Sequence, residues 1–188
     1  PVLEPELPIC DPHHHFCDLR PERLPYQRYL LHELLADIGN GHKVISTVFI
    51  ETRALYRLDG PPEMRPVGEV EFVQGLAAAS ASGLYGPSRA AAGIVGYADL
   101  NLGEKVEPVL EALQRASPNR FRGIRHPVTW DPHPEIHNTT AHNSQGLLAS
   151  ANFRAGARVL AKMGLSFDAW LYFPQLPELV EFARAVPD

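Results

Sequence analysis

The feature that most constrains the fold is a regular alternation of short apolar segments with amphipathic ones. The segments typical of strands are residues 9–13, 44–50, 92–98, 121–126 and 165–172. Helical spacing of apolar residues follows each of them, over residues 30–38, 69–81, 106–113, 153–164 and 176–186. Segment 44–50 is β-branched and almost wholly apolar, which predicts a strand buried on both faces. Strict alternation of this kind predicts a parallel sheet with right-handed crossovers.

Five β-α units fit either an open doubly wound sheet or a (β/α)8 barrel. No Gly-x-Gly-x-x-Gly or Walker-type loop follows any of the expected strands, which excludes the usual nucleotide-binding classes. The chain has 188 residues, whereas a (β/α)8 barrel takes about 250. As a barrel, residues 1–188 are therefore expected to form a single domain that holds the first five units of a longer one.

Composition limits the partners and the compartment. The net charge is −5 and no basic run is present, which argues against a nucleic-acid-binding protein. No apolar stretch approaches 18 residues and no signal-peptide pattern opens the chain, so neither a membrane span nor secretion is expected. Two cysteines, Cys10 and Cys17, do not make a disulfide framework. We expect a cytoplasmic protein with a small-molecule substrate, and a homo-oligomer stays open.

The most informative segment is Asp11-Pro12-His13-His14-His15, at the end of the first expected strand. Because side chains alternate faces along a strand, His13 and His15 should project together and His14 away from them. Two imidazoles on one face suit a divalent metal ion. Two ligands do not complete a tetrahedral site, so other strands would have to contribute.

An Asp-x-His-x-His motif that closes a first strand resembles the amidohydrolase superfamily. A second motif, Phe-Arg-Gly-Ile-Arg-His at 121–126, is similar to the amidohydrolase-related branch of sugar lactonases, a pyrone-dicarboxylate lactonase and aromatic acid decarboxylases. Further matching segments are 92–96, 98–100, 165–168 and 174–177. The resemblance implies a (β/α)8 barrel, present here as its first five units, with the site at the carboxyl ends of the strands.

The resemblance also implies roles for particular residues. His13 and His15 match first-strand histidines that bind a metal or the substrate, and Arg125 and His126 match groups that face an acidic substrate. The family's fifth-strand metal histidine has no counterpart in 165–172, where the substrate-facing candidates are Trp170 and Tyr172. The implied cofactor is a divalent metal, zinc first, but the branch also contains members without one. Its sixth-strand histidine and eighth-strand aspartate would lie beyond Asp188.

Three weaker candidates come from strand ends and loops. Glu51 ends the second expected strand, where it would bind substrate or pair with Arg53. The Arg125 guanidinium is a planar fork that matches a carboxylate. The loop after the fourth strand fits a lid. The alternative is a polar loop with three solvated histidines: His133, His137 and His142.

Together these residues predict a hydrolase acting on a lactone, or on another cyclic ester or amide, of a carboxylated small molecule. His13 and His15 would hold the metal or the carbonyl oxygen. Arg125 would anchor a carboxylate, and His126 would support either the oxyanion or this anchor. Two alternatives stay open: a non-oxidative decarboxylase of an aromatic acid, and a catalytically silent barrel fragment. Because five units leave two open strand edges and lack the eighth-strand aspartate, we expect the 188-residue chain alone to be unstable or associated, and inactive.

Overall fold

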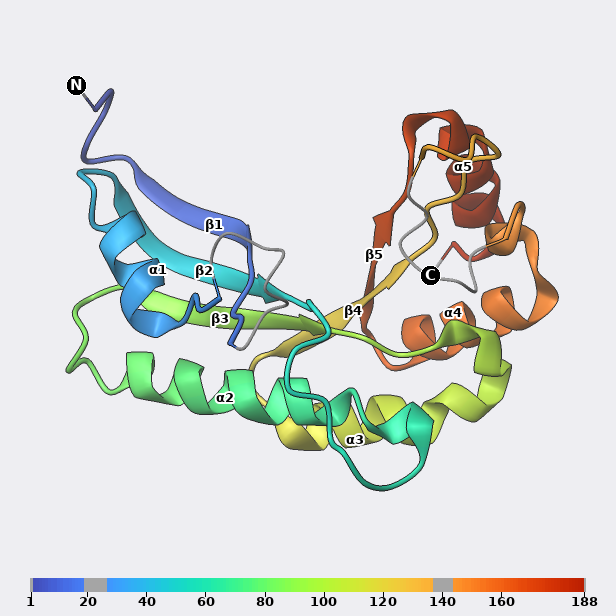
Figure 1. Cartoon of the computed structure of the whole chain (residues 1–188), viewed down its shortest axis with the longest axis horizontal. Helices are drawn as coiled ribbons and strands as arrows, with labels where there is room; N and C mark the ends of the chain where they lie inside the picture. The colour runs from blue at the N-terminus through green and yellow to red at the C-terminus, as the bar shows by residue number, and fades with distance from the viewer. Residues whose placement is uncertain (1, 19–26, 137–143, 188) are drawn as a thin grey trace. The chain divides into compact units, whose positions relative to one another are not determined.

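Strands and helices alternate along the whole chain in the computed structural model (Figure 1), which describes residues 2–18, 27–136 and 144–187. The strands are β1 (Pro8–His14), β2 (Lys43–Ile50), β3 (Arg89–Gly96), β4 (Phe121–Pro127) and β5 (Ser166–Trp170). The α-helices are α1 (Leu31–Ile38), α2 (Val67–Ala81), α3 (Glu107–Ala116), α4 (Ala151–Lys162) and α5 (Leu176–Ala185). Short 3-10 turns are η1 (Pro62–Met64), η2 (Leu100–Val106), η3 (Leu147–Ala149) and η4 (Phe173–Gln175). No helix within the described ranges is both long and apolar enough to cross a membrane.

The strands are parallel and follow one another in chain order, β1-β2-β3-β4-β5. Parallel strands joined by helices confirm the predicted fold class, the first five units of a (β/α)8-type architecture. The chain divides into two compact units. The first holds Pro1–Gly96 and Leu113–Arg122, and the second holds Tyr97–Ala112 and Gly123–Asp188. Each unit has its own core and its own candidate residues.

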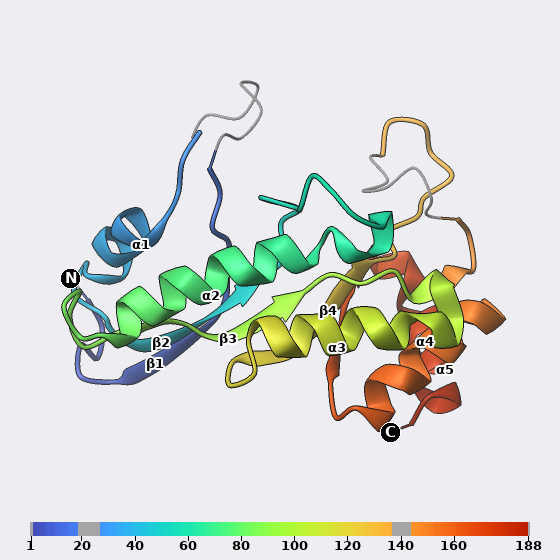
Figure 2. The same cartoon turned by 90° about the horizontal axis from the view of Figure 1, so that it is seen from below.

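In the first unit, α2 packs against β3 along its length (Figure 2). Gly96 of β3 permits this approach, because a Cβ there would lie 3.0 Å from Val70 Cγ2 and 3.2 Å from Phe121 Cε2. The segment before β4 is tied to the same helix, since Ser117 Oγ and Arg120 Nη1 both donate to Gln74 Oε1 at 2.7 and 3.0 Å. Fully buried apolar side chains of this unit include Phe16, Leu34, Phe49, Val70, Val73 and Ile94.

Strand β2 is less buried than its sequence predicts. Thr47, Phe49 and Ile50 are buried, but Ile45 is 48% exposed. A hollow of about 560 Å³, lined by Leu35 and Ile45 among others, lies beside the first half of the strand. The prediction of burial on both faces is therefore wrong for that half, because no side chain of residues 2–18, 27–136 or 144–187 fills the space next to it.

The second unit packs α4 against the η2 turn. Gly156 of α4 is in direct contact with the Leu100 backbone, since a Cβ there would lie 2.5 Å from the Leu100 carbonyl oxygen. Phe153 forms edge-to-face contacts with Phe167 and Phe182. This aromatic cluster lies directly behind the carboxyl end of β4, where the second set of candidate residues is found.

Candidate functional site

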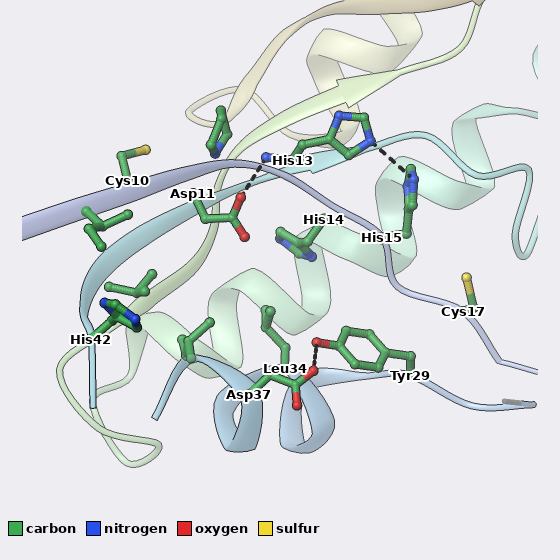
Figure 3. A pocket seen from close by; sticks show the side chains of 14 residues that line it. Cys10, Asp11, His13, His14, His15, Cys17, Tyr29, Leu34, Asp37 and His42 are labelled. Atoms are coloured by element: carbon green, nitrogen blue, oxygen red, sulfur yellow. Dashed lines mark hydrogen bonds between the residues drawn. The ribbon is translucent and has the colours of Figure 1, made fainter. Parts of the chain in front are cut away.

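The carboxyl end of β1 brings two histidine rings together. His13 Nε2 and His15 Nε2 are 3.3 Å apart, with ring centroids 5.0 Å apart (Figure 3). The strand has one extra residue relative to β2 between Asp11 and His14, and Asp11 Oδ1 accepts the His13 N–H at 3.1 Å. The two rings therefore share a side of the strand, as the alternation predicted, while their role stays a prediction.

A backbone carbonyl determines which ring nitrogen of His15 carries the proton. Its Nδ1 lies 2.8 Å from the carbonyl oxygen of Ile50, the last residue of β2. A carbonyl can only accept, so Nδ1 carries the proton and Nε2 keeps its lone pair. His13 Nε2–H then donates to His15 Nε2. An Nδ1–H to carbonyl bond is the arrangement that orients metal-binding histidines in proteins.

The spacing of these two nitrogens fits a tetrahedral metal ion. Nitrogens about 2.05 Å from zinc at a tetrahedral angle lie about 3.3 Å apart, which is the observed separation. His13 would bind through Nε2 once its proton moved to Nδ1. No cluster of three or more His, Cys, Asp or Glu side chains suited to a metal occurs among the described residues. The pair therefore fits two positions of a metal site.

His14 points to the opposite side of β1, toward α1 (Figure 3). Its ring contacts Phe16 and Phe49 at centroid distances of 4.7 and 6.0 Å. Neither ring nitrogen has a hydrogen-bond partner within the described part of the chain. Burial lowers the pKa of His14 from 6.5 to about 4, so the side chain is neutral at physiological pH.

A hollow of about 720 Å³ lies between β1 and α1 (Figure 3). Asp11 and Asp37 line it, and the Tyr29 hydroxyl donates to Asp37 Oδ2 at 2.6 Å. Burial, followed by the hydrogen bond to Asp37, raises the pKa of Tyr29. The His14 ring nitrogens are fully covered, so they do not face this hollow as donors or acceptors.

Two buried carboxylates stand at the carboxyl end of β2. Glu51 is 1% exposed and its N–H donates to the Val95 carbonyl at 2.8 Å. Glu69 of α2 is equally buried, and its Oε1 accepts the N–H groups of Thr52 and Ala54 at 3.0 and 2.8 Å. The substrate or Arg53 contact expected for Glu51 stays a prediction.

Glu69 is a structural residue that the sequence analysis did not single out. The loop it holds contains Arg53 at φ 60° and Leu55 at φ 52°, a conformation that non-glycine residues rarely adopt. The available signal was a carboxylate four residues before Val73, on the apolar face of the helix. Such a carboxylate must be paired inside the fold, and here it pairs with backbone donors.

The carboxyl ends of β4 and β5 bring Arg125 and Trp170 together in the second unit. Arg125 is 8% exposed, and its guanidinium carbon lies 4.6 Å from the Trp170 ring centroid. Trp170 therefore contacts Arg125, the residue predicted to bind a substrate carboxylate. Tyr172 follows at the start of the next turn, where its N–H donates to Gln175 Oε1 at 3.2 Å.

His126, the residue after Arg125, is buried and contacts two aromatic rings. It is 3% exposed, and its ring contacts those of Tyr97 and Phe153 at centroid distances of 5.3 and 5.1 Å. The Leu100 N–H donates to His126 Nδ1 at 3.2 Å. An amide nitrogen can only donate, so Nδ1 is unprotonated and the neutral ring carries its proton on Nε2.

The loop after β4 is only partly described. His133 is exposed, and its Nδ1 accepts the Glu135 N–H at 3.3 Å. His137 and His142 lie outside the described residues, so the predicted lid stays a prediction.

Comparison with known proteins gives no match to any family model. One curated protein, "Uncharacterized protein y4mH" of Sinorhizobium fredii, is 30% identical over an alignment of 200 residues. The alignment covers 97% of this chain and 60% of that protein.

Solved amidohydrolases share the fold. An amidohydrolase from Burkholderia multivorans with bound HEPES superposes with a TM-score of 0.62 at 19% identity, covering 93% of this chain and 52% of the other. The zinc-bound form gives 0.62 at 20% identity. Amidohydrolase 2 from Bifidobacterium longum subsp. infantis gives 0.59 at 21% identity, covering 96% and 58%. The chain thus has the amidohydrolase fold and spans about half the length of these structures. The resemblance found in the sequence is confirmed at the level of fold.

Proposed function

We propose that the protein is a hydrolase of the amidohydrolase superfamily that acts on a lactone, or on another cyclic ester or amide, of a carboxylated small molecule. The observation that carries this proposal is the pair of Nε2 atoms 3.3 Å apart at the end of β1. In (β/α)8 enzymes the catalytic groups follow the carboxyl ends of the strands. Two further candidates, Arg125 and His126, come from the corresponding end of β4.

His13 and His15 are the residues that would hold a divalent metal, zinc first. A bound metal would polarise the substrate carbonyl and lower the pKa of water. The Nδ1–H bond of His15 to Ile50 supports this role, because it leaves the Nε2 lone pair outward. Without a metal, the His13 Nε2–H would have to turn from His15 Nε2, to which it now donates, in order to donate to the carbonyl oxygen. Among the solved structures of this fold, the Burkholderia multivorans protein has bound zinc.

Arg125 and His126 would handle the negative charges of the substrate. The buried Arg125 guanidinium, whose central carbon lies 4.6 Å from the Trp170 ring centroid, has the planar fork that suits a carboxylate. His126 offers an Nε2–H donor for the oxyanion formed when water attacks the carbonyl. The contacts of this ring with Tyr97 and Phe153 support its present orientation.

Zinc binding and turnover test the proposal. Chelated protein is dialysed against zinc, and the retained metal is measured for wild type, His13→Ala, His15→Ala and the exposed control His32→Ala. We expect retention in wild type and the control, and its loss in the other two. Retention by all four proteins would contradict the assignment of the ligands.

The reaction is tested on a panel of carboxylated lactones, with the 188-residue chain and with a version that continues past Asp188. Acid release without CO2 in the longer version supports the hydrolase. CO2 release from aromatic acids would contradict the hydrolase and support the alternative decarboxylase. Inactivity of the longer version on every substrate would contradict both activities.

A further inference from the structure

The backbone amide of Leu100 favours one tautomer of His126. This N–H donates to the Nδ1 lone pair at 3.2 Å, and the buried imidazole also contacts the rings of Tyr97 and Phe153. Whatever sets the direction of the Leu100 amide therefore favours the tautomer of His126 that carries its proton on Nε2.

Asp99 holds the turn that contains this amide. Its Oδ1 accepts the Asn101 N–H at 2.9 Å and the Asn101 Nδ2–H at 3.0 Å, capping η2. The same Oδ1 is 3.9 Å from His126 Nδ1, too far for a hydrogen bond. With that oxygen already accepting two donors and Nδ1 already accepting one, Asp99 acts on His126 through the turn and not as a direct partner.

Gly156 of α4 supports the turn from the other side. A Cβ at this position would lie 2.5 Å from the Leu100 carbonyl oxygen and 3.1 Å from Leu100 Cα. Both contacts are with backbone atoms, which cannot rotate away as a side chain would. Any residue larger than glycine therefore has to push the Leu100 peptide off its present position.

We propose that Asp99 and Gly156 are positioning residues that hold the Leu100 amide against His126, so that His126 meets the substrate as an Nε2–H donor and not as a base. The inference rests on the proposed function for its catalytic consequence. The tautomer itself is independent of any substrate and can be measured separately.

Nitrogen-15 NMR of histidine-labelled protein reads the tautomer directly. We expect the wild-type His126 signals to report a protonated Nε2 and a bare Nδ1, and Asp99→Asn, which keeps the accepting oxygen, to leave them unchanged. Asp99→Ala and Gly156→Ala should shift part of the population to Nδ1–H. The matched control is Gly75→Ala in α2, where a Cβ meets nothing within 4 Å. If Gly156→Ala fails to fold, Asp99→Ala still decides the matter, because its side chain is 41% exposed.

Kinetics separate a donor from a base. Gly156→Ala should lower kcat by roughly 10²-fold, the scale of a misplacement of about 1 Å, with little change in KM. His126→Gln, whose amide nitrogen replaces Nε2–H, should retain more activity than His126→Asn. An Nδ1–H tautomer in wild type, or loss of the Nε2–H tautomer in Asp99→Asn, would overturn the inference. The predicted tautomers without turnover of any carboxylated lactone would support the positioning and contradict the proposed function.

Discussion

Two histidines, one in each unit, are held by opposite backbone groups. His15 faces the carbonyl of Ile50, and His126 faces the amide of Leu100, each through Nδ1. The first arrangement leaves a lone pair on Nε2, which suits a metal ligand, and the second leaves a proton there, which suits a hydrogen-bond donor. A neighbouring backbone atom thus favours opposite chemistry in the same type of side chain.

The two sites also differ in their exposure to solvent. The His13–His15 pair is open to solvent on the His13 side, so that an ion can enter. His126 is 3% exposed and contacts two aromatic rings. A donor gains strength from exclusion of water, whereas a metal site needs an entry path.

The largest expected effect is the loss of stability when Phe153, which contacts His126, is removed. Phe153→Ala removes a fully buried ring that contacts His126 and Phe182, so the free energy of unfolding should fall by about 3–5 kcal/mol. Denaturant titration measures this. Phe173→Ala, on a side chain 83% exposed, is the control and should change stability by less than about 0.5 kcal/mol. Equal effects would contradict the assigned core.

The next effect is on the anchor beside His126. Arg125→Met should raise KM for a carboxylated substrate by an amount equal to about 2–5 kcal/mol, because a desolvated charged contact is lost. Arg122→Met, on an exposed residue of the same strand, is the matched control. Unchanged kinetics on every carboxylated substrate would remove Arg125 from the proposed site.

His14 makes the first unit sensitive to acid. Its folded pKa of about 4 lies below its ordinary value of 6.5, so the unfolded state binds the extra proton between these values. Stability is therefore complete above about pH 6.5 and falls as the pH drops toward 4, by about 3 kcal/mol for this one group. Chemical unfolding across this range should show a shallower pH dependence in His14→Phe than in wild type. An unchanged slope would show that other groups dominate it.

The smallest expected effect is on KM, when the Trp170 ring that contacts Arg125 is replaced. Trp170→Leu removes the cation–π contact with Arg125 and should raise KM by the equivalent of about 0.5–1 kcal/mol, since the ring is 41% exposed. Trp170→Phe keeps an aromatic face and should lie between Trp170→Leu and wild type. An effect as large as that of Arg125→Met would mean that Trp170 contacts the substrate itself.

The order of strands and helices could be predicted because its cause is local. Apolar spacing fixes each element over a few neighbouring residues, and the two-residue period of β1 placed His13 and His15 together. The burial of β2 could not be predicted in the same way, because it depends on which side chains of other elements reach Ile45.

The proton positions were beyond sequence reasoning for a different reason. Ile50 lies 35 residues from His15, and Leu100 lies 26 residues from His126. In both cases the partner is a backbone atom, which every residue possesses, so no residue type signals the contact. Gly156 left a weak sign, a glycine inside a helical pattern, but only the packing of Leu100 shows what it is for.

The most direct test of this account is a zinc titration of the full chain followed by nitrogen-15 NMR of its histidines. Before zinc, His15 should carry its proton on Nδ1 and His126 on Nε2. On addition of zinc, the signals of His13 and His15 should shift together, with His13 changing tautomer, while those of His126 stay in place. Identical tautomers at His15 and His126, or a zinc response at His126 without one at His15, would contradict the claim that backbone contacts prepare the two histidines for opposite chemistry.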